Sequence, residues 1–221
     1  YGQQRCYCLG DTLDSVMNYP LRRAVIDFFT GVCDAHHLRR VILHQQEVYP
    51  APFFYSLMNL LGSHARVRIL NSMAGYAREG AAQMDRAAAS KSCLDKETRA
   101  AAQKKVLEAI KLLCALPGAP TIYYGDEIGM QGMADPWNRA PMDWDHADEA
   151  VHSAVKQLLN HRLNTPILQT GHLTRLHIAR PGRLSLRCHH RLACAHHRTT
   201  RLTHQAIQTR LRLTHRLINA C

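Results

Sequence analysis

Short apolar runs alternate along the chain with longer stretches in which apolar residues recur at helical spacing. The apolar runs predict buried strands at residues 13–19, 57–61 and 121–124. Apolar residues three or four positions apart predict amphipathic helices in residues 21–29, 38–42, 95–116 and 151–164. Strands that alternate with amphipathic helices are typical of βαβ units, in which helices cover a parallel sheet. The sequence therefore predicts an α/β fold.

Residues that begin or end helices support these boundaries. Gly31 follows the first helical stretch, where a helix end favours a residue that tolerates positive φ. The second stretch must end before Pro50, because proline has no amide hydrogen to donate. Asp95 is the predicted N-cap of the third helix, and Pro117-Gly118 predicts its end.

Polar residues lie at or just beyond the carboxyl end of each predicted strand. They are Asn18-Tyr19, Ser63-His64 and the stretch 125–145. In open α/β sheets and in barrels alike, ligands are bound by the loops at the carboxyl ends of parallel strands. These three segments are therefore where we expect functional residues.

The overall composition narrows the class of protein. Hydrophobic residues make up 46% of the 221 residues, which is enough for a packed core and excludes a disordered chain. No apolar run approaches the roughly 20 residues of a membrane-spanning helix, so we expect no membrane protein. The formal net charge of +11 at pH 7 is typical of proteins that bind nucleic acids or anionic surfaces.

This charge is unevenly distributed, however. Residues 1–149 contain 16 Lys and Arg and 17 Asp and Glu, a net charge of −1, whereas residues 150–221 contain 12 Lys and Arg and no acidic residue. Ten of the 15 histidines follow Glu149, and the last aromatic residue is Trp144. Packed domains seldom lack both aromatic and acidic residues. The positive charge therefore belongs to a C-terminal tail of unusual composition.

Four motifs at the carboxyl ends of the predicted strands occur together in a known family. They are Leu-Asp-Ser-Val-Met-Asn-Tyr-Pro at 13–20, Asn-Leu-Leu-Gly-Ser-His at 59–64 with Arg68 close behind, Pro-Gly-Ala-Pro-Thr-Ile-Tyr-Tyr-Gly-Asp-Glu-Ile-Gly-Met-Gln-Gly at 117–132 and Asp-Pro-Trp-Asn-Arg-Ala-Pro-Met-Asp-Trp-Asp at 135–145. In this order and spacing, the chain resembles the α-amylase family, glycoside hydrolase family 13, of the neopullulanase, cyclomaltodextrinase or amylopullulanase type. The resemblance covers about residues 1–173.

The resemblance implies a fold, an activity and a ligand. The family has a (β/α)8 TIM barrel and cleaves the α-glucosidic bonds of α-glucans such as starch, pullulan, maltodextrin and cyclodextrin, with retention of configuration. The chain would contain an incomplete barrel, about strands six to eight with their helices, and would belong to carbohydrate metabolism. An α-glucan oligosaccharide is the expected ligand. No cofactor is expected; calcium occurs in the family, but the sequence identifies no metal site.

The resemblance also predicts that catalytic residues are missing. A retaining glycosidase needs two carboxyl groups, one as nucleophile and one as acid. In the family they lie on strands four and five, which would precede Tyr1. A third carboxylate would follow His64, where this chain has Ala65. We therefore expect a catalytically inactive fragment. Asp126 and Glu127 are adjacent and point to opposite faces of an extended segment, which favours a structural role over shared acid–base work.

By the same resemblance, substrate binding falls to His64, Asp135 and Arg139. A carboxylate and a guanidinium suit sugar recognition, because a diol offers a donor and an acceptor side by side. Trp137 and Trp144 are candidates for stacking on sugar rings. Simpler interpretations stay open: a strand-end histidine, a surface ion pair, and tryptophans that serve packing.

The predicted domain organisation has three parts. Residues 1–164 form the C-terminal portion of the barrel, residues 165–173 begin a C-terminal β-domain, and residues 174–221 form an irregular basic tail. This tail is rich in Arg, His, Leu and Thr and repeats the phrase Arg-Leu-Thr-His. Such repetition is typical of low-complexity or out-of-frame translation, and a shifted reading frame is our hypothesis for it.

Other functions compete with the family interpretation. Cys188-His189-His190, with residues 194–197, offers the ligand types that zinc binds, at a spacing that matches no usual zinc finger. A basic tail would bind nucleic acid without sequence specificity, through phosphate contacts. A third hypothesis is a noncatalytic oligosaccharide-binding or interaction module. The cysteines before residue 150 lack the spacing of a disulfide framework, which favours free thiols and, with the resemblance, a cytoplasmic location.

Overall fold

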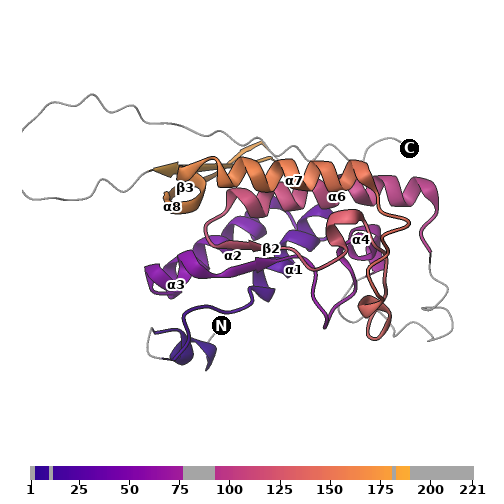
Figure 1. Cartoon of the computed structure of the whole chain (residues 1–221). Coiled ribbons are helices and arrows are strands. Elements are labelled where there is room, and N and C mark those ends of the chain that lie inside the picture. Colours follow the sequence, from indigo (N-terminus) through magenta and orange to yellow (C-terminus); the bar gives the residue numbers. More distant parts are fainter. Residues whose placement is uncertain (1–2, 10–11, 77–92, 181–182, 190–221) are drawn as a thin grey trace, which may run out of the picture.

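The computed structural model describes residues 3–9, 12–76, 93–180 and 183–189 as a mixed α/β structure with few strands (Figure 1). Its helices are α1 (Tyr19–Phe29), α2 (Ala35–Val48), α3 (Ala51–Ser56), α4 (Ile69–Asn71), α6 (Lys96–Ala115), α7 (Glu149–Leu163) and α8 (Pro166–Thr170). The shorter helical turns are η1 (Gln3–Cys8), η2 (Ser72–Tyr76), η3 (Asp126–Ile128) and η4 (Trp137–Arg139). The strands are β1 (Met58–Leu60), β2 (Ala119–Thr121), β3 (His172–Arg180) and β4 (Arg183–His189).

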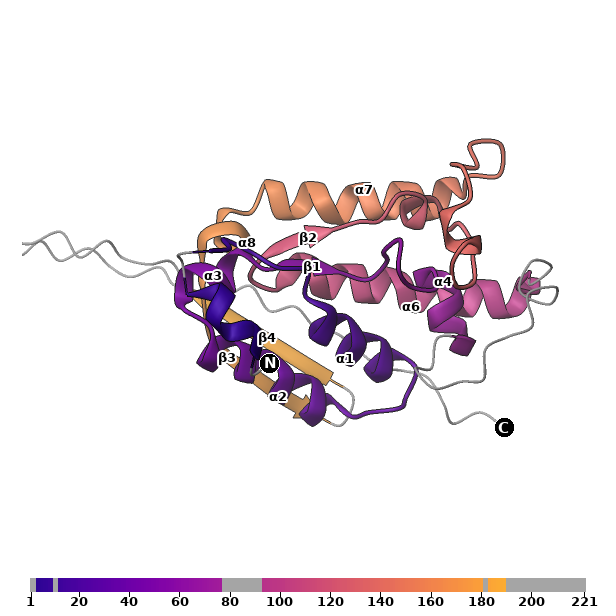
Figure 2. The ribbon, with the colours of Figure 1, turned by 90° about the horizontal axis from the view of Figure 1, so that it is seen from below.

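A small parallel sheet runs through the centre of the molecule (Figure 2). β1 pairs in parallel with β2, with Met58 opposite Ala119 and Leu60 opposite Thr121. Met17 adds one parallel bridge to Met58 on the other side of β1. Three consecutive extended segments are thus parallel, with helices between them, as the hydrophobic pattern predicts.

Two of the predicted strands differ in extent from those observed. Residues 13–19 contribute only the single bridge, because Asn18 already serves as the N-cap of α1. β2 lies two residues earlier than the predicted strand 121–124, since the chain turns after Ile122 and the amide of Asp126 donates to the Tyr123 carbonyl. The strand predicted at 57–61 is confirmed.

The four predicted amphipathic helices are all present. Asn18 Oδ1 accepts a hydrogen bond from the Leu21 amide at the start of α1, and Gly31 follows the helix with a φ of 78°. Asp95 caps α6 by accepting from the Thr98 amide at 2.9 Å. The short helices α3 and α8 were not predicted. Each has a proline in its first turn, where the missing amide hydrogen leaves no hydrogen bond unmade.

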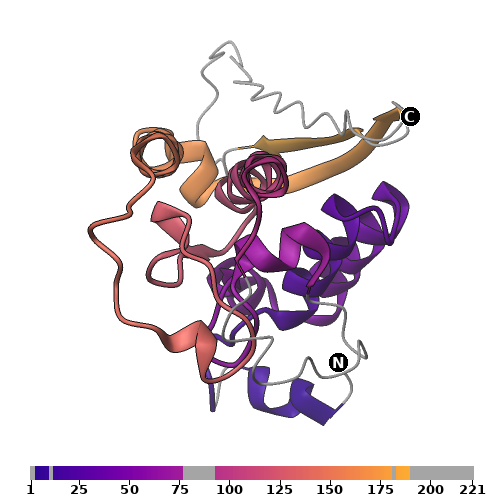
Figure 3. The same cartoon turned by 90° about the vertical axis from the view of Figure 1, so that its right-hand side faces the viewer.

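The helices bury their apolar stripes against the sheet and one another. α6 and α7 lie side by side, seen nearly end-on in Figure 3. Arg162 of α7 is buried and donates through Nη1 to the Cys114 carbonyl at 2.7 Å and through Nη2 to the Gly118 carbonyl at 2.6 Å. One side chain therefore ties α7 to the end of α6 and to the turn that precedes β2.

The start of the basic tail is folded, contrary to the irregular structure predicted from residue 174. β3 and β4 form an antiparallel hairpin that spans this boundary. Leu173 and Leu176 are buried, and their carbonyls accept hydrogen bonds from Gln46 and Arg39 of α2 at 2.9 and 2.8 Å. The hairpin is thus docked on α2, which a composition argument alone does not reveal. Residues 190–221, which carry most of the zinc, nucleic-acid and reading-frame hypotheses, lie outside the described residues.

Two further observations concern the described part of the chain. None of its helices is long and apolar enough to cross a membrane. Within it, Cys6, Cys8, Cys33, Cys93 and Cys114 form no disulfide bond. The cytoplasmic location stays a prediction.

Candidate functional site

Three segments meet beyond the carboxyl ends of β1 and β2. We call them the β1 loop (residues 61–68), the β2 loop (residues 122–132) and the η4 segment (residues 133–140). The sequence predicts functional residues on all three, and hydrogen bonds join each segment to the other two.

The β1 loop is held to the η4 segment by Asn138. This side chain is fully buried, and its Nδ2 donates to the backbone carbonyls of Ser63, His64 and Arg66 at 3.4, 2.7 and 2.9 Å. Within the loop, the Arg66 amide donates to the Ser63 carbonyl at 3.3 Å. The carbonyls of a tight turn thus converge on one carboxamide.

Two tyrosines hold the β2 loop to the η4 segment. The Tyr123 hydroxyl donates to the Asn138 carbonyl at 3.4 Å, and the Tyr124 hydroxyl donates to the Ala140 carbonyl at 2.8 Å. Burial raises the pKa of Tyr123 and the interaction with the neighbouring hydroxyl of Tyr124 raises it further, while the nearby cations Arg68 and Arg139 partly oppose this shift. The η4 segment is therefore anchored on both sides.

The buried side chain of Arg68 joins the β1 loop to the β2 loop. Its side chain is fully buried; Nη1 donates to the Tyr124 carbonyl at 2.6 Å and lies 3.6 Å from Asp126 Oδ1. The guanidinium carbon lies 5.0 and 4.7 Å from the ring centroids of Tyr123 and Tyr124. A weakly hydrated, planar cation suits this setting, because it pairs with a carboxylate and packs on aromatic rings at once.

Asp126 is buried beneath the loops and does not face the solvent. Burial raises its pKa to about 7, although the positive charge of Arg68 acts in the opposite direction. A side chain on Gly62 would overlap Asp126 Oδ2, so the glycine leaves the room that this carboxyl occupies. The structural role predicted for Asp126 agrees with this placement, but the extended segment predicted for Asp126 and Glu127 is wrong, because residues 126–128 form the helical turn η3. Glu127 is half-buried beside it in η3.

The predicted sugar-binding residues lie on the exposed side of the same loops. His64 is exposed at the turn of the β1 loop. Asp135 and Arg139 form an exposed ion pair, with Arg139 Nη2 3.0 Å from Asp135 Oδ2. Trp137 and Trp144 are 37% and 73% exposed, so Trp144 in particular is free of the packing role considered for it.

Ala65, at the position where the resemblance predicts a third carboxylate, is exposed. The Ala65 amide donates to the Ser63 hydroxyl at 3.3 Å, and the Tyr19 hydroxyl also donates to that oxygen, at 3.1 Å. Arg22 of α1 fixes the strand end behind the loop by donating to the Leu61 carbonyl at 2.6 Å. The turn is therefore ordered by contacts that need no carboxylate at position 65.

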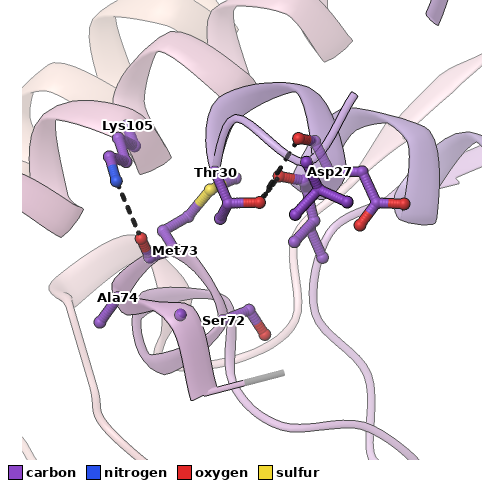
Figure 4. Close-up of a pocket in the computed structure, with 9 residues that line it drawn as sticks. Asp27, Thr30, Ser72, Met73, Ala74 and Lys105 are labelled. Atoms are coloured by element: carbon purple, nitrogen blue, oxygen red, sulfur yellow. Dashed lines mark hydrogen bonds between the residues drawn. The ribbon is translucent and has the colours of Figure 1, made fainter. Parts of the chain in front are cut away.

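No group of three or more His, Cys, Asp or Glu side chains in the described ranges is arranged to hold a metal ion. A separate pocket of about 170 Å³ lies between α1, η2 and α6 (Figure 4). Its polar groups have partners in the protein: Lys105 donates to the Met73 carbonyl at 3.3 Å, and Thr30 donates to the Ile26 carbonyl at 2.8 Å. None of its lining residues belongs to the three site segments.

Sequence reasoning missed the residues that assemble the site. Asn138 and Arg68 are both fully buried, although polar side chains of these types are mostly exposed and no role was assigned to either from the sequence. Glycines were the available signal, because Gly62 and Gly132 stand where a side chain would meet Asp126 and the Trp137 carbonyl, respectively. Such positions indicate that segments approach closely.

Comparisons with known proteins point to one family. The chain is 38% identical over 180 residues to an amylopullulanase from Thermoanaerobacter thermohydrosulfuricus, which covers 76% of this chain and 12% of that protein. It is 30% identical over 181 residues to neopullulanase 2 from Thermoactinomyces vulgaris, covering 80% of this chain and 26% of the relative. The chain thus spans about a quarter or less of the curated relatives that it matches. No family model matches it.

Solved structures give the same picture. Cyclic α-maltosyl-(1→6)-maltose hydrolase from Arthrobacter globiformis, in complex with maltose, is similar with a TM-score of 0.66 and 27% identity. The similarity covers 83% of this chain and 37% of that one. An alpha-amylase from Geobacillus thermoleovorans, at 24% identity and a TM-score of 0.66, shares the fold.

Proposed function

Since the chain is related to the neopullulanase-like enzymes of the α-amylase family, glycoside hydrolase family 13, we propose that it forms part of an α-glucan-binding cleft. In this proposal its parallel segments are strands six to eight of a (β/α)8 barrel, and the whole protein is a retaining glycosidase. The 221-residue chain binds an α-glucan oligosaccharide through His64, Asp135 and Arg139 and does not cleave it.

One observation carries this proposal: the exposed face of the loops offers the polar groups that a sugar diol needs. The Asp135 carboxylate accepts hydrogen bonds, the Arg139 guanidinium donates them, and the two are 3.0 Å apart. Asn138 joins the same segment to the backbone of His64. The indole rings of Trp137 and Trp144 are exposed, and such rings suit the apolar faces of glucose rings.

The absence of cleavage rests on the positions of the carboxyl groups. A retaining mechanism needs two carboxyl groups about 5–5.5 Å apart, on either side of the glycosidic bond. On the three site segments, Asp126 is buried, Glu127 has one carboxylate oxygen buried, and Asp135 is paired with Arg139. Ala65 stands where the third family carboxylate is expected. These side chains provide no accessible pair for the chemistry.

Replacing Arg139 by alanine tests the site. We expect Arg139→Ala to weaken maltotriose binding at least about tenfold, because a charge-assisted hydrogen bond contributes roughly 1.5–3 kcal/mol. Arg23→Ala is the matched control, because Arg23 is exposed on α1 and forms an ion pair with Asp27, four residues further along the chain, at 3.7 Å. This variant should leave the affinity unchanged. The measurement is isothermal titration calorimetry. An equal affinity of the Arg139 variant and the wild type would contradict the assignment.

A further inference from the structure

Asn138 has a hydrogen-bonding arrangement that only a carboxamide of this orientation can make. Its Nδ2 points at three carbonyl oxygens of the β1 loop, while its Oδ1 is buried and has no hydrogen-bond partner within the described structure. Exchanging the two atoms would set an oxygen against three oxygens. The surroundings therefore require a donor here, and a carboxylate in its place would be repelled.

The backbone around Asn138 leaves little room for adjustment. A side chain on Gly132 would lie 3.1 Å from the Asn138 Cα and 2.6 Å from the Trp137 carbonyl, so the β2 loop packs directly against η4. The Asn138 carbonyl also accepts from Tyr123. If the Nδ2 contacts are lost, η4 stays in position and the β1 loop is the part released.

We propose that Asn138 is a positioning residue for sugar binding, which holds His64 at a fixed separation from Arg139. It is adjacent to Arg139 in η4, and it grips the His64 carbonyl at 2.7 Å. His64 and Arg139 belong to segments that are far apart in the chain, since 74 positions separate His64 from Asn138. The buried carboxamide of Asn138 thus sets the position of His64 relative to Arg139. This inference rests on the proposed function.

The test compares Asn138→Asp with Asn138→Ala. At pH 8 we expect Asn138→Asp to weaken maltotriose binding by about tenfold to a hundredfold, since an isosteric acceptor replaces the donor. Burial against three carbonyl oxygens raises the pKa of the introduced carboxyl group, so we expect it to be protonated at pH 5. It then regains one O–H donor, and affinity relative to the wild type should recover to within about threefold. Maltotriose binding by Asn138→Ala, relative to the wild type, should be weakened equally at pH 5 and pH 8. The charged or titratable side chains on the contacting segments are common to all three proteins, so their titration affects each protein alike. They are those of His64, Arg66, Arg68, Tyr123, Tyr124, Asp126, Glu127, Asp135 and Arg139.

Asn160→Asp is the matched control, because it makes the same chemical change at an exposed position on α7 and should leave affinity unchanged at both pH values. A purely structural defect would lower binding of Asn138→Asp without recovery at pH 5. That result would overturn the proposal.

A second measurement does not depend on sugar. Hydrogen–deuterium exchange at the amides of Ala65 and Arg66 should be at least about tenfold faster in Asn138→Ala than in the wild type, because the loop is released. Unchanged exchange would overturn the positioning role even if both proteins fail to bind maltotriose. Failure of the wild type to bind, with faster exchange in the variant, would instead refute the proposed function while the loop contact stands.

Discussion

Replacing Arg68 by methionine is expected to lower the free energy of unfolding by about 3–5 kcal/mol at pH 8. Arg68 is fully buried, and its guanidinium is the cation beside the buried carboxyl group of Asp126. Methionine fills part of the volume but leaves that carboxyl group without a compensating charge. It also removes the hydrogen bond to the Tyr124 carbonyl and the packing on two aromatic rings.

Urea denaturation followed by circular dichroism measures this change. Arg23→Met is the control, since Arg23 is exposed and its replacement should change stability by no more than about 0.5 kcal/mol. The double variant Arg68→Met/Asp126→Asn should recover about half of the loss, because it no longer buries an uncompensated charge. If the free energy of unfolding of Arg68→Met lies within about 1 kcal/mol of the wild-type value, the Arg68–Asp126 pair contributes little to stability and the prediction is wrong.

The free energy of unfolding of the wild type should fall by about 3 kcal/mol between pH 5 and pH 8. Burial raises the pKa of Asp126 from 3.8 to about 7, so the folded state holds a proton that the unfolded chain releases. The stabilisation is complete below the unfolded value and is lost as the pH rises through about 7. This sign is the reverse of that for the capping carboxylates Asp34 and Asp95, whose pKa values are lowered and which destabilise the fold only as the pH falls.

The variant Asp126→Asn isolates this contribution. It cannot titrate, so its stability should vary much less between pH 5 and pH 8 than that of the wild type. His146 is retained in both proteins; its pKa is raised by its hydrogen bond to Asp143, and it accounts for a residual slope of the same sign. Urea titrations at pH 5, 6, 7 and 8 provide the measurement. Parallel pH profiles for the two proteins would exclude Asp126 as the source.

Helices could be predicted from the sequence where a periodic hydrophobic pattern coincides with a capping residue. α6 is the clearest example, with Asp95 at its start and apolar residues at helical spacing to Cys114. The ends of the strands could not be predicted in this way, because a residue such as Asn18 belongs to a predicted strand and also caps the next helix through its side chain. The hairpin was missed because Leu173 and Leu176 gain their burial from α2, far away in the sequence.

The site could be predicted only on its exposed side. His64, Asp135 and Arg139 belong to recognisable motifs, and their expected positions on adjoining loops agree with the contacts of Asn138. The burial of Arg68 and Asn138 depends on how three loops pack, which the hydrophobic pattern of the sequence does not show. Gly62 and Gly132 are the trace that such packing leaves in the sequence.

Binding without cleavage is the central claim for this chain, and one NMR experiment addresses both halves of it. The purified protein is mixed with maltotriose, and saturation-transfer difference spectra are recorded at intervals over several days. The account predicts transfer from the protein to the sugar protons, with no growth of glucose or maltose signals over that of a protein-free sample. Absence of transfer, or products that accumulate above that blank, would contradict it.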